Sequence, residues 1–305
     1  MNNRENRGMS RFFRAVLPLF VTAAIIAGCG KGAPSPSETG GPADSLRLVS
    51  TAPSNTEIIA GLGLGEDIVA ADRYSLGLPG LSPGIPEIDF FYPDPEVLVN
   101  LQPDIVIASE HNSFGTGEDP FRLLSGMGVR VLYIPTSRSI DDIRQDIMSI
   151  ASGLGVPERG EGLIREMDRE IEAVAAVGRT ISPKKPVYFE LSPFPNPATM
   201  GRETFLNEML EITGALNVFA DKTGWIAPSA EAILERNPEV ILTNVSFIDD
   251  PLGEIKSRQG FADTTAVRNG AVYLIDADSS SRPSQRLTLA LRQIALAVYP
   301  EYYGQ

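Results

Sequence analysis

FFYPDPEVLVNLQPDIVIAS at residues 90–109 is echoed by WIAPSAEAILERNPEVILTN at residues 225–244. The two stretches match at a constant offset of 135 residues, which pairs Phe90 with Trp225 and Glu96 with Glu231. Each starts at an aromatic residue, continues as a short helix with a glutamate in its first turn, stops at a proline and resumes as a buried strand. The chain is therefore predicted to hold two similar lobes, and their matching parts suggest a cleft between them.

Strand and helix patterns alternate throughout both halves. Apolar strand patterns occupy residues 46–50, 68–71, 105–108, 129–134, 187–191, 240–243 and 271–275. Helical patterns start at residue 56 and occupy residues 121–126, 205–212 and 283–299. Such alternation is typical of parallel sheets covered by helices. The predicted fold class is α/β, with two lobes of mainly parallel sheet that share one topology.

A helical pattern at residues 139–180 separates the two halves. Ser139 is a suitable N-cap, Asp141 and Asp142 occupy the first turn, and isoleucines follow at helical spacing. Residues 153–157 are expected to interrupt the helix before an apolar stripe resumes. We interpret this region as a single long helical linker that acts as a stiff hinge, although an ordinary packing helix has the same pattern. The predicted lobes are residues 46–138 and 181–305.

The amino terminus has the pattern of a bacterial lipoprotein signal peptide. Residues 1–14 carry four arginines, an apolar run follows, and IAGC ends at Cys29, the only cysteine. The run is shorter than the ~20 residues of a membrane-spanning helix. Cleavage after residue 28 would leave a lipidated Cys29 and a Gly-, Pro- and Ser-rich flexible tether at residues 29–45. A signal anchor or a buried free thiol is the alternative.

The mature chain is strongly acidic. Removal of residues 1–28 takes away four arginines and one glutamate, which leaves 22 basic and 38 acidic residues and a formal charge of −16. Nucleic acid is excluded as a partner because phosphate binding needs clustered Lys and Arg. Solubility is sufficient to explain the charge.

Residues 46–305 resemble the helical-backbone (class III) periplasmic substrate-binding proteins of importers for vitamin B12, ferric siderophores and haem. The stretches that carry this resemblance are LVSTAPSNTE (48–57), QPDIVI (102–107), NPEVIL (237–242) and RPSQRL (282–287). The resemblance implies a monomeric, non-enzymatic protein that captures a cobalt- or iron-containing chelate and delivers it to an ABC permease dimer. It also implies a periplasmic or extracytoplasmic location, with attachment to the membrane through the lipid on Cys29.

The resemblance further assigns a role to the repeated glutamates. In that family each lobe presents a surface glutamate to arginines of the permease, and the matching positions are Glu96 and Glu231. Two carboxylates on equivalent lobe surfaces would fix orientation, even if each exposed ion pair contributes only ~1 kcal/mol. A glutamate at a helix start can also serve only to favour the helix dipole.

Ligands of open α/β folds bind beyond the carboxyl ends of the strands. The loops expected there are rich in aromatic residues, which suit a flat, partly apolar ligand. In the resembling B12 binders, aromatic residues at the positions of Phe90 and Trp225 line the cleft. The predicted ligand-binding residues are Ser54, Tyr74, Phe90, Phe91, Tyr92, His111, Phe194, Trp225, Phe247 and Arg282. Arg73 and Arg282 could bind carboxylates of a siderophore or haem, which leaves the ligand open between cobalamin, siderophore and haem.

His111 is the only histidine and could ligate iron or cobalt in the bound chelate, although a lone loop histidine can equally be a surface residue. One histidine and one cysteine are too few for a direct zinc or manganese site, so no metal site or cofactor of the protein itself is expected. No nucleophile elbow or phosphate-binding loop is present, which argues against an enzyme. A lipoprotein scaffold or signalling receptor remains the other reading.

Overall fold

The computed structural model describes residues 46–112 and 119–304. The predicted signal peptide, Cys29 and the tether lie outside these residues. Among the described helices, none combines the length and apolar character that a membrane span requires. The described residues belong to one compact unit, Ser45–Gln305.

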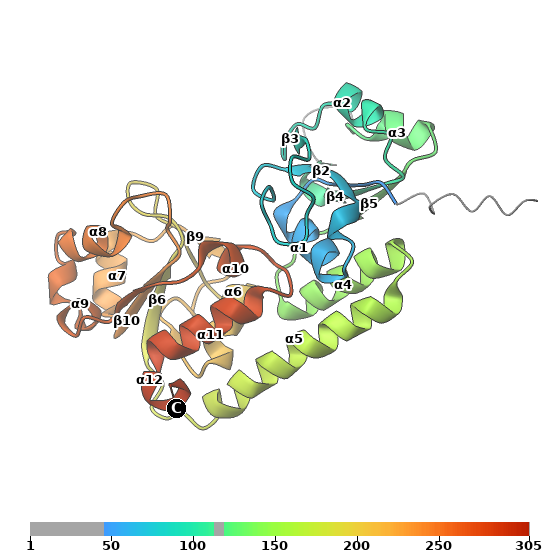
Figure 1. The fold of residues 1–305 in the computed structure, drawn as a ribbon. Helices are drawn as coiled ribbons and strands as arrows, with labels where there is room; N and C mark the ends of the chain where they lie inside the picture. Colours follow the sequence, from blue (N-terminus) through green and yellow to red (C-terminus); the bar gives the residue numbers. More distant parts are fainter. Residues whose placement is uncertain (1–45, 113–118, 305) are drawn as a thin grey trace, which may run out of the picture. The chain divides into compact units, whose positions relative to one another are not determined.

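The first half, here called the N-lobe, is built on a parallel sheet with the strand order β3-β2-β1-β4-β5 (Figure 1). Its strands are β1 (Leu48–Ser50), β2 (Ile68–Asp72), β3 (Glu87–Ile88), β4 (Ile105–Ser109) and β5 (Arg130–Ile134). Its helices are α1 (Pro53–Gly61), α2 (Pro95–Asn100) and α3 (Arg122–Gly126).

The second half, here called the C-lobe, has a parallel sheet of order β11-β10-β6-β8 and a small antiparallel sheet. The parallel strands are β6 (Pro186–Glu190), β8 (Leu216–Asn217), β10 (Val240–Thr243) and β11 (Val272–Leu274), and the antiparallel pair is β7 (Thr199–Met200) and β9 (Trp225–Ile226). The helices are α6 (Phe205–Ile212), α7 (Ala230–Arg236), α8 (Pro251–Ser257), α9 (Thr265–Arg268), α10 (Ala277–Ser281), α11 (Leu287–Val298) and α12 (Pro300–Tyr303).

The two parallel sheets share one topology, as the repeat predicts. The order β2-β1-β4-β5 in the N-lobe corresponds to β8-β6-β10-β11 in the C-lobe, and β3 is an extra edge strand. Within the repeat, α2 and α7 begin at equivalent positions, Pro95 and Ala230. The α/β fold prediction is confirmed. The last long helix starts at Leu287 rather than residue 283, because residues 282–286 form a turn between α10 and α11.

The helical segment between the lobes consists of two helices, α4 (Ile140–Gly153) and α5 (Pro157–Gly178). Ser139 and Asp142 form a capping box at the start of α4, with both hydrogen bonds at 3.0 Å. α4 packs against α1 and β5, whereas α5 also packs against α6 and α11, so α5 is the helix that passes from one lobe to the other (Figure 1). The interruption expected at residues 153–157 is confirmed, since residues 154–156 lie between the two helices.

The hydrophobic core explains how the sheets and the connecting helices hold together. Side chains alternate between the two faces of each strand. One face of each sheet packs against a hydrophobic cluster that belongs to its own lobe. This cluster surrounds Val106 in the N-lobe and Ile241 in the C-lobe. The other faces contribute to a single shared cluster that also includes Ile147 of α4 and Met167 of α5. Because this cluster is continuous, large movements between the lobes require repacking of a dense interior.

Asp146 of α4 is a buried carboxyl at the edge of this shared core. Burial raises the pKa of Asp146 from 3.8 to about 6, against the effect of its hydrogen bond from the Ser137 hydroxyl at 2.5 Å. The folded state therefore holds this proton more tightly than the unfolded state. Its contribution to stability is complete below about pH 4 and is lost as the pH rises through about 6.

We expect this group to lower the free energy of unfolding by about 2 kcal/mol between about pH 4 and about pH 7. Asp146→Asn should remove that dependence, since the amide is neutral at both pH values. Urea unfolding at the two pH values measures the difference, with the exposed Asp141→Asn as the control on the same helix. Parallel pH profiles for the wild type and Asp146→Asn would contradict the assignment.

Candidate functional site

A cavity of about 240 Å³ lies at the carboxyl ends of the N-lobe strands and is closed on one side by the C-lobe. The N-lobe contributes the start of α1 and the residues that follow β4 and β5. Its lining residues are Ala52, Pro53, Ser54, Asn55, Phe90, Ser109, His111, Ile134, Pro135 and Thr136. The C-lobe contributes the segment after α10, with Ser281, Arg282 and Pro283.

Asn112 fixes the loops on the N-lobe side of this cavity. Its side-chain amide donates to the carbonyl oxygen of Phe90 at 2.7 Å. Its Oδ1 accepts from the Thr51 hydroxyl at 2.8 Å and from the Ser109 N–H at 3.2 Å. One buried side chain therefore joins three loops that follow different strands, so Phe90 is held at a defined position.

Asn55 combines burial with an unused hydrogen-bonding group. It lies in the first turn of α1, is 2% exposed and lines the cavity. Its amide nitrogen Nδ2 has no hydrogen-bond partner among the described residues. Buried polar groups without partners are costly, and they are often satisfied by water or a ligand.

Four of the predicted ligand-binding residues come together in this cavity: Ser54, Phe90, His111 and Arg282. The Phe90 and His111 rings meet edge to face with their centroids 6.3 Å apart. Phe91, which does not line the cavity, also meets Phe90 edge to face, with centroids 4.7 Å apart. The cavity therefore has an aromatic wall beside an imidazole.

The other predicted residues do not line this cavity. Tyr74, Phe91, Tyr92, Trp225 and Phe247 are exposed, and Tyr92 is 80% exposed. Single exposed aromatic residues are common on protein surfaces, so their exposure does not by itself assign them a binding role.

Two aromatic residues of the C-lobe have neighbours of their own. Trp225, on β9, meets Phe205 with ring centroids 6.5 Å apart. Phe194 lies beneath the guanidinium of Arg258 at 5.2 Å, which makes it part of the C-lobe packing.

The two candidate arginines differ in their surroundings. Arg73 is exposed and pairs with Glu87 at 3.1 Å, the surface pairing that was the alternative to a cleft role. Arg282 is nearly buried, and its guanidinium pairs with Glu57 at 2.9 Å and Asp278 at 2.6 Å. Its charge is therefore balanced by carboxylates of the protein rather than held free for a ligand.

Pro135 and Thr136 are cavity residues that sequence reasoning missed. They directly follow β5, so the rule that ligands lie beyond the carboxyl ends of strands would have found them. Within residues 46–112 and 119–304 no group of three or more His, Cys, Asp and Glu side chains is arranged to hold a metal ion.

Glu96 and Glu231 occupy equivalent, exposed positions in the first turns of α2 and α7. The helices are capped by Asp94 and Ser229, which are also equivalent in the repeat. The backbone N–H of Glu231 and the Ser229 hydroxyl hold the pKa of Glu231 below its usual value. In the described part of the chain, neither glutamate forms an ion pair, so both carboxylates are free to meet a cationic partner.

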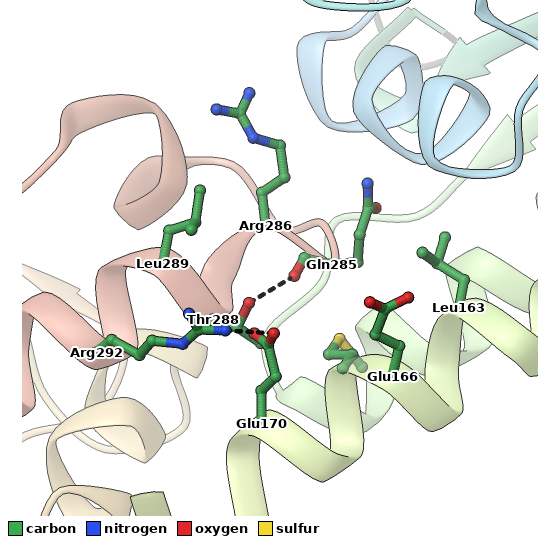
Figure 2. A pocket seen from close by; sticks show the side chains of 9 residues that line it. Leu163, Glu166, Glu170, Gln285, Arg286, Thr288, Leu289 and Arg292 are labelled. Atoms are coloured by element: carbon green, nitrogen blue, oxygen red, sulfur yellow. Dashed lines mark hydrogen bonds and ion pairs between the residues drawn. The ribbon is translucent and has the colours of Figure 1, made fainter. Parts of the chain in front are cut away.

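A second cavity of about 220 Å³ lies between α5 and α11 (Figure 2). Glu170 of α5 pairs there with Arg292 of α11. This cavity is lined by α5, α11 and the turn that precedes α11, and not by loops at the carboxyl ends of strands, so it lacks the position expected of the ligand site.

Comparison with known proteins agrees with this geometry. A family model described as periplasmic binding protein matches residues 48–279. The chain is 30% identical over 264 residues to the ABC transporter substrate-binding lipoprotein YvrC of Bacillus subtilis, covering 85% of this chain and 82% of the relative. It is 26% identical to the vitamin B12-binding protein of Vibrio cholerae, over 90% and 92% of the two chains. The solved structure of the periplasmic heme-binding protein RhuT from Roseiflexus sp. RS-1 is 28% identical to this chain and superposes with a TM-score of 0.71. The match covers 84% of this chain and 98% of RhuT.

Proposed function

This chain belongs to the periplasmic binding protein family, and we propose that it captures a metal chelate, a corrinoid or a ferric siderophore, and delivers it to the permease of an ABC importer. That it is a substrate-binding protein of the ABC-importer type follows from the family and from its relatives. The observation that carries the ligand proposal is Phe90, fixed in a cavity that both lobes line and flanked by further aromatic residues.

The size of the cavity indicates how such a ligand would bind. Pockets for drug-sized molecules usually measure roughly 300–1,000 Å³, which exceeds the 240 Å³ found here. The cavity would accept one edge or one axial group of a large chelate. The exposed aromatic residues outside it, Tyr92 and Trp225 among them, would cover the rest of the ligand.

A haem receptor of the same class is the second candidate. His111 lines the cavity next to Phe90, so its imidazole could reach an iron atom in a bound chelate while the ring of Phe90 packs on the macrocycle. A scaffold or signalling role without transport is disfavoured by the cavity itself, because a scaffold does not require one.

Attachment and delivery belong to the same proposal. Lipidation of Cys29 and the tether at residues 29–45 would hold the protein at the extracytoplasmic face of a membrane, and the lipoprotein name of YvrC supports this. The acyl chains of a lipoprotein would give stable anchoring. Glu96 and Glu231 would then dock the two lobes on the two subunits of a permease, with residues 46–138 and 181–305 as the lobes.

Phe90→Ala should weaken chelate binding by tenfold to a hundredfold. Loss of one aromatic contact surface is typically worth about 1–3 kcal/mol, and each 1.4 kcal/mol is a factor of ten in Kd. Trp225→Ala should weaken binding in the same direction. Isothermal calorimetry with the chelate that the wild type binds measures the change. Tyr302→Ala removes an exposed aromatic side chain of α12 and should leave Kd unchanged. Wild-type affinity in Phe90→Ala would rule out the cavity as the binding site.

A further inference from the structure

Two of the stretches that carry the family resemblance, residues 48–57 and 282–287, are in direct contact. Glu57 of α1 is 2% exposed. Its carboxylate accepts hydrogen bonds from Nη1 of Arg282 at 2.9 Å, from Nη1 of Arg286 at 2.9 Å and from the Ser284 hydroxyl at 2.5 Å. One N-lobe carboxylate therefore binds three side chains from a single turn of the C-lobe. We call Glu57, Arg282, Ser284, Gln285 and Arg286 the clamp.

Backbone contacts strengthen the clamp. The Gln285 side-chain amide donates to the carbonyl oxygen of Glu57 at 2.8 Å, and Nη2 of Arg282 donates to the carbonyl oxygen of Tyr74 at 3.0 Å. Figure 2 shows the side chains of Gln285 and Arg286 pointing away from α11 toward the N-lobe helix. A Cβ at Gly61 of α1 would lie 2.5 Å from Nε2 of Gln285, so any larger residue there would displace this amide from its position in the clamp.

The charges make this contact hard to open part way. A buried carboxylate that loses its cationic partners is strongly destabilised, because nothing else compensates its desolvation. If the lobes began to separate along this contact, Glu57 would lose both of its arginine partners, and Arg282 would keep only Asp278. Such contacts favour a fully closed or a fully open arrangement over intermediate ones.

The clamp also touches the ligand cavity. Arg282 and Pro283 form part of its C-lobe wall, while Glu57 lies within α1, whose first residues form part of the N-lobe wall. Glu57 therefore holds Arg282 of the C-lobe wall in position, although Glu57 itself does not line the cavity.

We propose that Glu57 is a positioning residue that, through the clamp, fixes the spacing between the two lobes and so the shape of the cavity. An effect of Glu57 on ligand affinity is expected only if the proposed function holds. Its effect on the distance between the lobes does not depend on that function. Glu57→Gln keeps the size of the side chain and removes the charge that holds both guanidinium groups. Arg286→Gln removes one partner whose side chain is partly exposed, so it disturbs folding less.

The test is a distance measurement by double electron–electron resonance without any ligand. Spin labels are attached through Asn100→Cys on α2 and Lys256→Cys on α8, both exposed, in the full chain carrying Cys29→Ser. Glu57→Gln should give an interlobe distance distribution about twofold wider than that of the protein with wild-type Glu57, because small changes in lobe spacing that the shared core permits are no longer opposed by the clamp. Arg286→Gln should widen it less. Circular dichroism checks that each variant is folded.

Glu190→Gln is the matched control, because Glu190 is an equally buried carboxylate whose arginine partner, Arg258, lies in the same lobe. It should leave the distribution unchanged. The proposal is overturned if folded Glu57→Gln and Arg286→Gln both keep the original distribution, or if Glu190→Gln widens it equally. Should Glu57→Gln fail to fold, Arg286→Gln alone decides. Since no ligand is present, a failure here is separate from a failure of the chelate proposal.

Discussion

Uptake should fall about tenfold to thirtyfold when Glu96 and Glu231 are both replaced by alanine, while the affinity for the chelate stays the same. Both carboxylates are exposed and without an ion-pair partner in the described part of the chain, at equivalent helix starts. Two exposed ion pairs of about 1 kcal/mol each correspond to roughly thirtyfold in the interaction with a permease. Uptake of labelled chelate by cells whose only copy is the variant measures this loss, and calorimetry on the purified variant measures affinity.

The control removes the same charge elsewhere. Glu66→Ala with Glu235→Ala also takes one exposed glutamate from each lobe and should transport normally. Helix-dipole contributions of about 0.5 kcal/mol at Glu96 and Glu231 would affect stability only slightly. Normal uptake by the Glu96 and Glu231 double variant would show that these carboxylates do not dock the permease.

Glu190→Ala should lower the free energy of unfolding by about 3–5 kcal/mol. Glu190, at the end of β6, is 1% exposed and accepts from both terminal nitrogens of Arg258, at 2.5 and 2.9 Å. Arg258 is also held by Glu254, and its guanidinium lies 5.2 Å from the ring centroid of Phe194 and 5.3 Å from that of Phe261. Removing Glu190 takes away the buried partner of a nearly buried guanidinium and leaves only the more exposed Glu254 to balance it, which is costly.

Burial by itself would lower the pKa of Arg258, but hydrogen bonds to Glu190 and Glu254 raise it above its usual value in the wild type. Arginine keeps its proton in proteins, so the guanidinium also stays charged in the variant. Urea unfolding measures the loss. Glu172→Ala, which breaks the exposed pair with Arg179, should cost under about 1 kcal/mol. Equal losses in the two variants would mean that burial does not decide the strength of the Glu190 pair.

The repeat in the sequence predicted more of the fold than any single motif. The constant offset between residues 90–109 and 225–244 predicted that the halves share a topology, and the strand orders confirm it. Local signals were equally direct where one residue decides the geometry, as at the Ser139 capping box. The helical linker and its break at residues 153–157 are confirmed. Periodicity shows a buried face but not its neighbour, so the packing of α4 on the N-lobe left no signal in the sequence.

The site was only partly predictable. Strand ends and aromatic loops pointed to Phe90 and His111, which do line a cavity. The sequence placed Arg282 in the cleft as a possible ligand group, but its charge is paired with Glu57, which lies 225 residues away in the chain. Contacts over such a separation leave no periodic or local signal. A single sequence therefore shows which residues are charged but not which of those charges are already balanced.

Capture of a metal chelate is tested most directly by fluorescence titration of the full chain, with Trp225 as its only tryptophan. The titrants are cyanocobalamin, a panel of ferric siderophores and haem, with correction for their absorbance and with calorimetry in parallel. We predict saturable binding of one class at micromolar or lower concentration, with quenching of Trp225 and a weaker response in Phe90→Ala. No binding of any of the three classes by either method would contradict the proposal.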